Sequence, residues 1–212
     1  MVVQQARART RQQRILRAAA TVIARRGYRA AAVDEIAREA RTSKGGIYFH
    51  FAGKEAILLA LLDHAAALLR RKVEAAIALE REPVACADAA LRVLLQTLAK
   101  HRSLARVLTI EALAAGPQVA ARVTAIQDEF AALIEEQLDL AVADGTIDPI
   151  DTRVVAQAWM GLLHGVITRW LTAPDRAPPD ATYVTLRRLL LRSVGAALPA
   201  VPHPAAIRLD AS

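Results

Sequence analysis

The chain has 212 residues and a net charge of +7, and 54% of its residues are hydrophobic, 23% charged and 4% aromatic. These values indicate a globular protein with a sizeable core and exclude a chain that is disordered throughout. The single cysteine, Cys86, excludes an internal disulfide framework, and arginines at positions 7, 9, 11, 14 and 17 interrupt any signal-peptide core, so we expect a cytoplasmic protein.

Positive charge is concentrated at the N-terminal end. Residues 1–54 carry twelve Lys and Arg against three acids, a sum of +9, whereas residues 55–212 carry sixteen against eighteen, a sum of −2. A basic module followed by a nearly neutral one predicts binding to a polyanion. A membrane-surface anchor is the alternative for the basic end, but the longest uncharged run, 154–168, is too short and polar to span a bilayer.

A helix is predicted behind a flexible basic arm at residues 1–9. Thr10 and Gln13 have the spacing of a capping box, which predicts the helix start. Apolar residues then recur at helical period as far as Ile23, and Gly27 predicts the end.

Two short helices follow. The first covers residues 33–40, and the second begins after Ser43, a good N-cap residue. Gly45 and Gly46 lie in the first turn of this helix and leave bare backbone N–H groups open to an anion, for which phosphate is the natural candidate.

The second of these helices has two distinct faces. Ile47 and Phe51 are four residues apart and predict the face that enters the core. Lys44 and Tyr48 have the same spacing on another face and predict outward contacts. Two short helices joined by a tight turn are typical of a helix-turn-helix unit.

The N-terminal residues resemble the TetR family of transcriptional regulators. The resemblance runs from about Arg14 to Leu62 and rests on ordered fragments such as Gly27-Tyr28, residues 33–37, Ser43-Lys44-Gly45, residues 47–51 and residues 54–58. It implies DNA contacts, with Lys44 and Tyr48 best placed for bases and the glycine, histidine and second lysine for phosphates. The residues carried over are Ser43, Lys44, Gly45, Tyr48, Phe49, His50 and Lys54. The alternative to DNA contact is packing within the protein for Tyr48 and a position in the core for His50.

Three positions depart from the family pattern. Ala31 and Ala32 replace a threonine pair, which removes a predicted cap and phosphate contact. Arg41 stands where the turn usually carries glycine and is strained if its φ is positive. Thr42 replaces a common valine.

The remaining chain predicts further helices and no strand, so the fold class is all-α with about nine helices. A long helix from Lys54 ends before Pro83. Five further helices are predicted after it. Two of them cover residues 85–101 and 119–142, and a helix capped by Ser103 lies between these two. The last two are capped by Asp151 and by Asp180. We therefore divide the chain into a DNA-binding domain (1–54, with the three-helix unit at 10–51), a ligand-binding and dimerisation domain (55–198) and a flexible Pro-containing tail (199–212).

The resemblance also implies a homodimer, because one reading helix covers only half of a palindromic operator. The last two helices are the expected interface, since both carry broad apolar faces and Gly161 and Gly165 permit close helix approach. Ordinary packing of these helices within one chain is the alternative.

A small-molecule effector is expected among the helices of the second domain. The candidate ligand-binding residues are large or polar residues on apolar helix faces: Leu108, Phe130, Trp159, Leu163, His164 and Trp170. Such residues also occur in ordinary cores. An apolar pocket favours a lipophilic or acyl-type effector, and residues 101–111 resemble TetR-type regulators that sense fatty acyl thioesters.

No nucleophile elbow, phosphate loop, cysteine pair or close histidine and carboxylate cluster occurs, so we expect neither an enzyme nor a metal or cofactor site. The leading hypothesis is a ligand-responsive, homodimeric repressor, although the family resemblance leaves activation open. The alternatives are a sequence-indifferent architectural DNA-binding protein without an effector, and an interaction protein whose basic arm docks on acidic partners.

Overall fold

The computed structural model describes residues 2–173 and 175–198, with side chains from residue 10 onward. Its described part is helical and contains no strand, which confirms the predicted all-α class. The predicted tail at 199–212 lies outside the described residues. The α-helices are α1 (Val2–Arg26), α2 (Val33–Glu39), α3 (Lys44–Tyr48), α4 (Lys54–Ile77), α5 (Pro83–Lys100), α6 (Arg102–Arg106), α7 (Pro117–Ala143), α8 (Thr152–Thr172) and α9 (Tyr183–Ser193).

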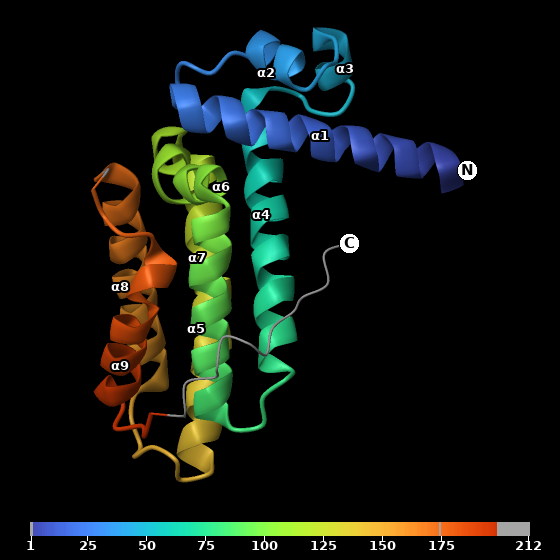
Figure 1. The fold of residues 1–212 in the computed structure, drawn as a ribbon. Coiled ribbons are helices and arrows are strands. Elements are labelled where there is room, and N and C mark those ends of the chain that lie inside the picture. The colour runs from blue at the N-terminus through green and yellow to red at the C-terminus, as the bar shows by residue number, and fades with distance from the viewer. Residues whose placement is uncertain (1, 174, 199–212) are drawn as a thin grey trace.

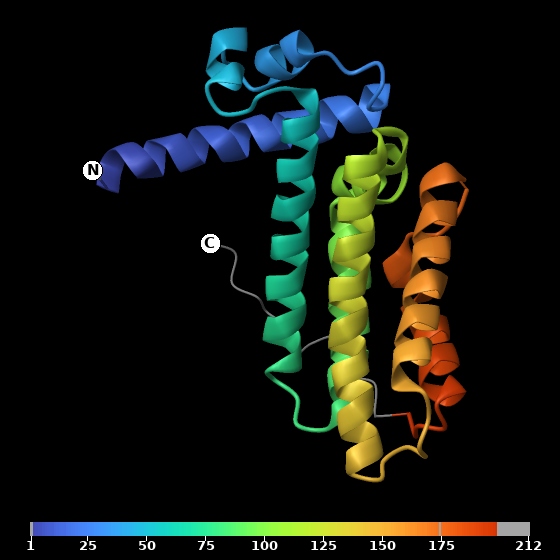
Figure 2. The same cartoon turned by 180° about the vertical axis from the view of Figure 1, so that it is seen from behind.

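The molecule consists of a small head, α1 to α3, across one end of a larger helical body (Figure 1). Helix α4 starts beneath the head and runs along the body, so it belongs to both parts. Helices α5 and α7 lie in the middle of the body, and α8 and α9 form the flank opposite α4 (Figures 1 and 2). A movement among the body helices can therefore reach the head through α4.

The head is built around the apolar face of α1. Ile15, Val22 and Ile23 are fully buried there, as their spacing predicted. Gly27 ends the helix with a positive φ of 79°. The predicted start at Thr10 and the flexible arm at 1–9 are wrong, because α1 already begins at Val2. Residues 2–9 are rich in Arg, Gln and Ala, which are good helix formers, and contain no Gly or Pro that would stop the helix.

Two predicted helix caps are also wrong. Ser103 lies within α6, which begins at Arg102 and continues into a π-helical turn, Val107–Glu111, and a 3₁₀ turn, Ala112–Ala114. Asp180 lies in a 3₁₀ turn, Pro179–Thr182, and α9 begins after it. By contrast, Asp151 caps α8 as predicted, with its carboxylate accepting a hydrogen bond from the Val154 N–H at 3.0 Å.

The body contains a buried ion pair that joins α5 to α9. Asp88 is 5% exposed and Arg187 is 3% exposed, and Arg187 Nε donates to the Asp88 carboxylate at 2.8 Å. The Tyr183 hydroxyl donates to the other carboxylate oxygen at 2.6 Å. Burial, and then this hydrogen bond, raise the pKa of Tyr183, which keeps the phenol protonated as a donor.

No described helix is long and apolar enough to cross a membrane.

Replacing Arg187 by Met is expected to lower the free energy of unfolding by about 3–5 kcal/mol, because the substitution leaves the buried Asp88 carboxylate without its counter-charge. Urea denaturation measures the change. Arg188→Met is the matched control, since Arg188 is exposed on the same helix and its replacement should alter stability by no more than about 0.5 kcal/mol. Equal effects of the two substitutions would contradict a structural role for the pair.

Candidate DNA interface and effector cavity

The short helix α3 is capped as the sequence predicted. The Ser43 hydroxyl accepts a hydrogen bond from the Gly46 N–H at 3.0 Å. A Cβ added at Gly46 would lie 2.6 Å from the Thr42 hydroxyl oxygen, so a side chain at this position meets the turn itself. At Gly45 the nearest such atom is the Ser43 oxygen at 3.9 Å, so that position is open. The backbone at Gly45 can therefore approach an external group closely.

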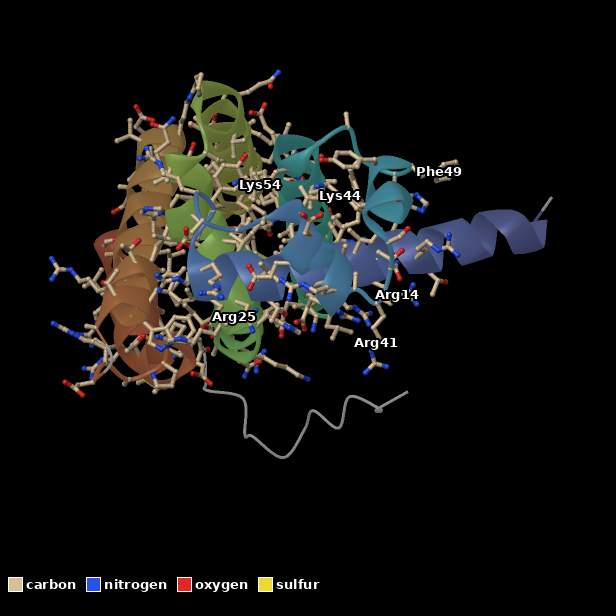
Figure 3. The ribbon with its side chains drawn as sticks, turned by 90° about the horizontal axis from the view of Figure 1, so that it is seen from above. Arg14, Arg25, Arg41, Lys44, Phe49 and Lys54 are labelled. Carbon is tan, nitrogen blue, oxygen red and sulfur yellow. The ribbon has the colours of Figure 1, made fainter. Side chains whose placement is uncertain are left out.

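The two faces of α3 separate as predicted. Ile47 is fully buried and Phe51 is 5% exposed, so they anchor the helix in the head. Tyr48 is 49% exposed and the adjacent Phe49 is 82% exposed. Phe49 points away from the ribbon at the outer end of α3 (Figure 3). An apolar ring so exposed beside a basic surface is suited to contact with a partner.

Lys44 lies at the start of α3 and forms an exposed ion pair with Asp34 of α2. Its Nζ is 3.1 Å from one carboxylate oxygen of Asp34. The hydrogen bond to Asp34 raises the pKa of the Lys44 ammonium. Exposed pairs of this kind contribute little stability, so Lys44 can exchange Asp34 for a phosphate or a base edge at little cost.

His50 turns inward more than the outward-facing residues of α3. Its Nε2 is buried and has no hydrogen-bond partner among the described residues. The Phe49 ring packs edge-on against the His50 ring, with centroids 5.1 Å apart. This geometry is closer to the core alternative than to a phosphate contact, and it makes His50 a support for Phe49.

Lys54 begins α4 and is engaged within the protein. Its Nζ donates to the carbonyl oxygens of Tyr28, Arg29 and Ala31 at 2.8, 3.1 and 3.0 Å. The ammonium also lies 4.6 Å from the centre of the Tyr28 ring. An ammonium has three N–H donors, and all three have partners here. We therefore remove Lys54 from the set of residues proposed to contact DNA.

The departures at residues 32 and 41 have consequences in the structure. Ala32 precedes α2 without a side-chain cap. Arg41 has a φ of 50° and is the one residue other than glycine with a positive φ in the described part of the chain. Arg41 and Arg14 both extend from the head into solvent (Figure 3). Arg25 and Arg26 instead bind Glu35 of α2 at 3.0 and 3.2 Å.

Three hollows adjoin one another in the body, and Met160 of α8 lines all of them. The deep hollow lies among α4, α5, α7, α8 and α9 and includes Asp88, Leu91 and Trp159. The central hollow lies nearer the head and includes Leu108, Thr109 and Gln127. The surface groove lies between α7 and α8 and includes Leu113, Asp128 and Gly161.

Five of the six predicted ligand-binding residues line these hollows. Phe130 and Leu163 line both the deep and the central hollow, Trp159 lines the first, and Leu108 and His164 line the second. Trp170 does not line any of the three, and its ring instead lies 4.5 Å below the Arg102 guanidinium. Sequence reasoning missed Met160 and Gln127. The helical spacing of Met160 with Leu163 and His164 on α8 was the available signal.

A buried carboxylate connects the central hollow to the head. Glu111 is 8% exposed and accepts a hydrogen bond from the Tyr28 N–H at 2.9 Å. Its other oxygen is 3.3 Å from Arg106 Nε. Glu111 belongs to the same π-helical turn as Leu108 and Thr109, which line the hollow. A shift of this π-helical turn must therefore either carry the backbone at Tyr28 with it or break the hydrogen bond between Glu111 and Tyr28.

Comparison with known proteins supports this division into head and body. Residues 15–61 match the family described as bacterial regulatory proteins, tetR family, and residues 80–194 match the family described as tetracyclin repressor-like, C-terminal domain. The chain belongs to the TetR family. The resemblance read from the sequence is thus confirmed, and the chain is a DNA-binding transcriptional regulator.

Individual TetR relatives match over different lengths. The A-factor receptor protein of Streptomyces griseus is 48% identical over 62 residues, which are 29% of this chain and only 22% of that protein. The HTH-type transcriptional regulator SrpR of Pseudomonas putida is 28% identical over 172 residues, 81% of this chain and 80% of that protein. The crystal structure of the transcriptional regulator FadR from Bacillus subtilis in complex with stearoyl-CoA has a TM-score of 0.77 at 24% identity, covering 84% of this chain and 96% of that one.

Lys54→Met in this TetR family protein is expected to lower the free energy of unfolding by about 2 kcal/mol or more, because three carbonyls lose a charged donor. It should leave the salt dependence of DNA binding unchanged. Arg14→Met is the matched control, because Arg14 extends from the head into solvent: it should reduce the slope of log K against log salt by about 1, as for one lost phosphate contact, with little change in stability. Urea denaturation and DNA titration at several salt concentrations measure both. The opposite pattern would restore Lys54 to the DNA interface.

Proposed function

We propose that this protein is a homodimeric repressor that binds a palindromic operator through α3 and releases it when a small lipophilic effector enters the body. The observation that carries the proposal is the connection between Glu111 and Tyr28, which ties the turn lining the central hollow to a head that exposes Lys44, Tyr48 and Phe49. A DNA partner also fits a cytoplasmic location and a regulatory rather than catalytic role.

At the operator, we infer that Lys44 and Tyr48 contact bases and that the backbone around Gly45 contacts phosphate. Ser43 holds the first turn of α3, and Phe49 adds an apolar contact such as packing on a thymine methyl group. His50 supports the Phe49 ring, since its own Nε2 is buried. Arg14 and Arg41 extend from the same head and are suited to sequence-independent phosphate contacts.

For the dimer, we propose the outer faces of α8 and α9. Ala158, Gly161 and Gly165 recur along α8, and a Cβ added at either glycine would meet nothing within 4 Å. On α9, Val184 and Leu189 are about half exposed. Small residues permit close approach of a second helix, and exposed apolar residues are stabilised by burial in such a contact.

For the effector, we infer a molecule with an apolar chain, because most residues that line the deep and central hollows are apolar. In this conformation the cavity volumes are only about 50 and 100 Å³, so entry of a chain must separate the helices. The effector would then bind the conformation with separated helices more tightly than the present one. Release requires such a difference, because a ligand that binds two conformations equally does not change their populations. An acyl chain fits this description, and stearoyl-CoA is bound in the related FadR structure.

Selection from a random duplex library at about 0.15 M salt tests operator recognition, because nonspecific binding is weak there. We expect enrichment of one palindrome whose half-sites lie about one turn, roughly 34 Å, apart. Lys44→Ala and Tyr48→Ala should each weaken binding to it by about ten-fold or more, the size of one lost base contact. Retention of DNA only at low salt, with no enriched sequence, would favour an architectural DNA-binding protein.

Ala158→Arg tests the proposed dimer face. The side chain of residue 158 is exposed, so the monomer should fold normally, whereas a dimer through α8 would bury an unpaired charge. We expect a monomer by light scattering and loss of operator binding. Leu140→Arg is the control, because Leu140 is 49% exposed on α7, a helix outside the proposed α8 and α9 face. A dimeric Ala158→Arg protein would rule out this interface.

A further inference from the structure

The three hollows follow one another from the α5 and α9 side of the body to its surface, and neighbouring hollows share wall residues. Leu94, Phe130, Met160 and Leu163 line both the deep and the central hollow. Val123, Gln127, Met160 and His164 line both the central hollow and the surface groove. An amphiphile can therefore place its chain in the first two hollows and its polar head in the groove.

The walls of these hollows are apolar inside and polar at the groove. The deep hollow has two polar residues, Asp88 and Gln137, and the Asp88 carboxylate is already bonded to Tyr183 and Arg187. At the groove, the polar residues are Thr124, Gln127, Asp128, Gln157 and His164. Gln127 Nε2 lies 3.3 Å from His164 Nδ1, so these two groups are linked where the groove meets the central hollow.

No lysine or arginine is among the described residues that line any of the three hollows. The arginines between α4 and α7 are already paired: Arg122 of α7 with Asp63 and Glu129, and Arg70 of α4 with Glu129. The one charged residue at the groove is Asp128, which is exposed and has no partner among the described residues. The groove therefore presents one negative charge, no positive charge, and uncharged hydrogen-bond donors and acceptors to a ligand head.

This distribution of charge discriminates between ligand heads. An anionic head leaving water for the groove would find no cation and would lie near the Asp128 carboxylate, so both desolvation and repulsion oppose it. A hydroxyl or ammonium head can instead donate to Asp128 or to the Gln127 carbonyl. Because Asp128 is exposed, its attraction for a cation is screened and amounts to a few-fold in affinity.

We propose that the effector is an amphiphile whose head is uncharged or cationic and donates hydrogen bonds, with its chain in the deep and central hollows and its head in the surface groove beside Asp128. Gly161 belongs both to this groove and to the proposed dimer face, so in the proposed dimer the head lies at the edge of the interface, on the α7 side. This inference rests on the proposed effector function and narrows it. It separates this protein from a regulator that binds an acyl-CoA, whose head is polyanionic.

The test is direct binding, without DNA, of four molecules that share a twelve-carbon chain: dodecylamine, dodecanol, dodecanoate and dodecanoyl-CoA, each below its micellar concentration. The chain has two tryptophans, and Trp159 lines the deep hollow whereas Trp170 does not. In the Trp170→Phe variant, fluorescence therefore reports on Trp159 alone. Calorimetric titration of the unaltered protein repeats the ranking, in case Trp170→Phe disturbs the fold.

We expect dodecylamine and dodecanol to bind about ten-fold or more tightly than dodecanoate and dodecanoyl-CoA, because an anion is left uncompensated. Asp128→Asn should weaken dodecylamine binding by about two- to five-fold, the size of an exposed charge pair, and leave dodecanol unchanged. Glu136→Gln is the matched control, since Glu136 is exposed on the same helix but does not line a hollow. It should change neither affinity.

Tighter or equal binding of dodecanoate or dodecanoyl-CoA would overturn the proposal while leaving a lipophilic effector in place. An Asp128→Asn protein that binds dodecylamine as well as the unaltered chain would overturn the placement of the head. If none of the four molecules binds, both this inference and the effector pocket fall. Operator selection, which needs no ligand, would still decide the DNA-binding function.

Discussion

The relation between head and body depends on the backbone of Tyr28. Its N–H donates to the buried carboxylate of Glu111, and its carbonyl accepts from the ammonium of Lys54. One peptide segment is thus held between an anion from the body and a cation from the first turn of α4. Hydrogen bonds to charged groups contribute about 1.5–3 kcal/mol each to stability. They also require a particular orientation of donor and acceptor, which apolar contacts do not. These few polar atoms thus add directional restraints to the apolar core that the head shares with the body.

This arrangement gives the proposed apolar effector a route to the proposed DNA interface. The turn at Val107–Glu111 lines the central hollow with Leu108 and Thr109 and holds the head with Glu111. A π-helical turn is rare and less stable than an α-helical one, and such turns occur often at functional sites. Helix α4 offers a second route, because it starts at Lys54 and its Val73 and Ile77 line the deep hollow. Both routes converge on Tyr28.

Local sequence signals predicted most of the helices and the two faces of α3. Ser43, Ile47 and Phe51 could be interpreted because a cap and an i, i+4 apolar pair depend on neighbouring residues alone. The start of α1 was misplaced because a capping-box pattern at Thr10 does not end a preceding run of helix formers. Phe130 and Leu163 were found because large apolar residues on an inner helix face line whatever cavity forms there.

Long-range polar contacts could not be predicted in this way. Lys54 matched a family motif, yet its three acceptors lie 23 to 26 residues earlier in the chain, and nothing in the local pattern specifies them. Arg187, which pairs with Asp88, is 99 residues away from it, and Tyr28, whose N–H donates to Glu111, is 83 residues away from it. The local sequence does not distinguish these charged residues from others, because their partners come close only in the tertiary fold.

The two adjacent glycines of α3 differ in a way that bears on how operator preference can diverge. Position 46 is closed by the Thr42 side chain, whereas position 45 opens outward beside the exposed face of the helix. A side chain at residue 45 would enter the space in which a phosphate is proposed to approach the helix backbone, so it would alter DNA binding without repacking the head, whereas one at residue 46 would repack the turn. Of the two positions, residue 45 is therefore the one at which a substitution is expected to change DNA binding separately from folding.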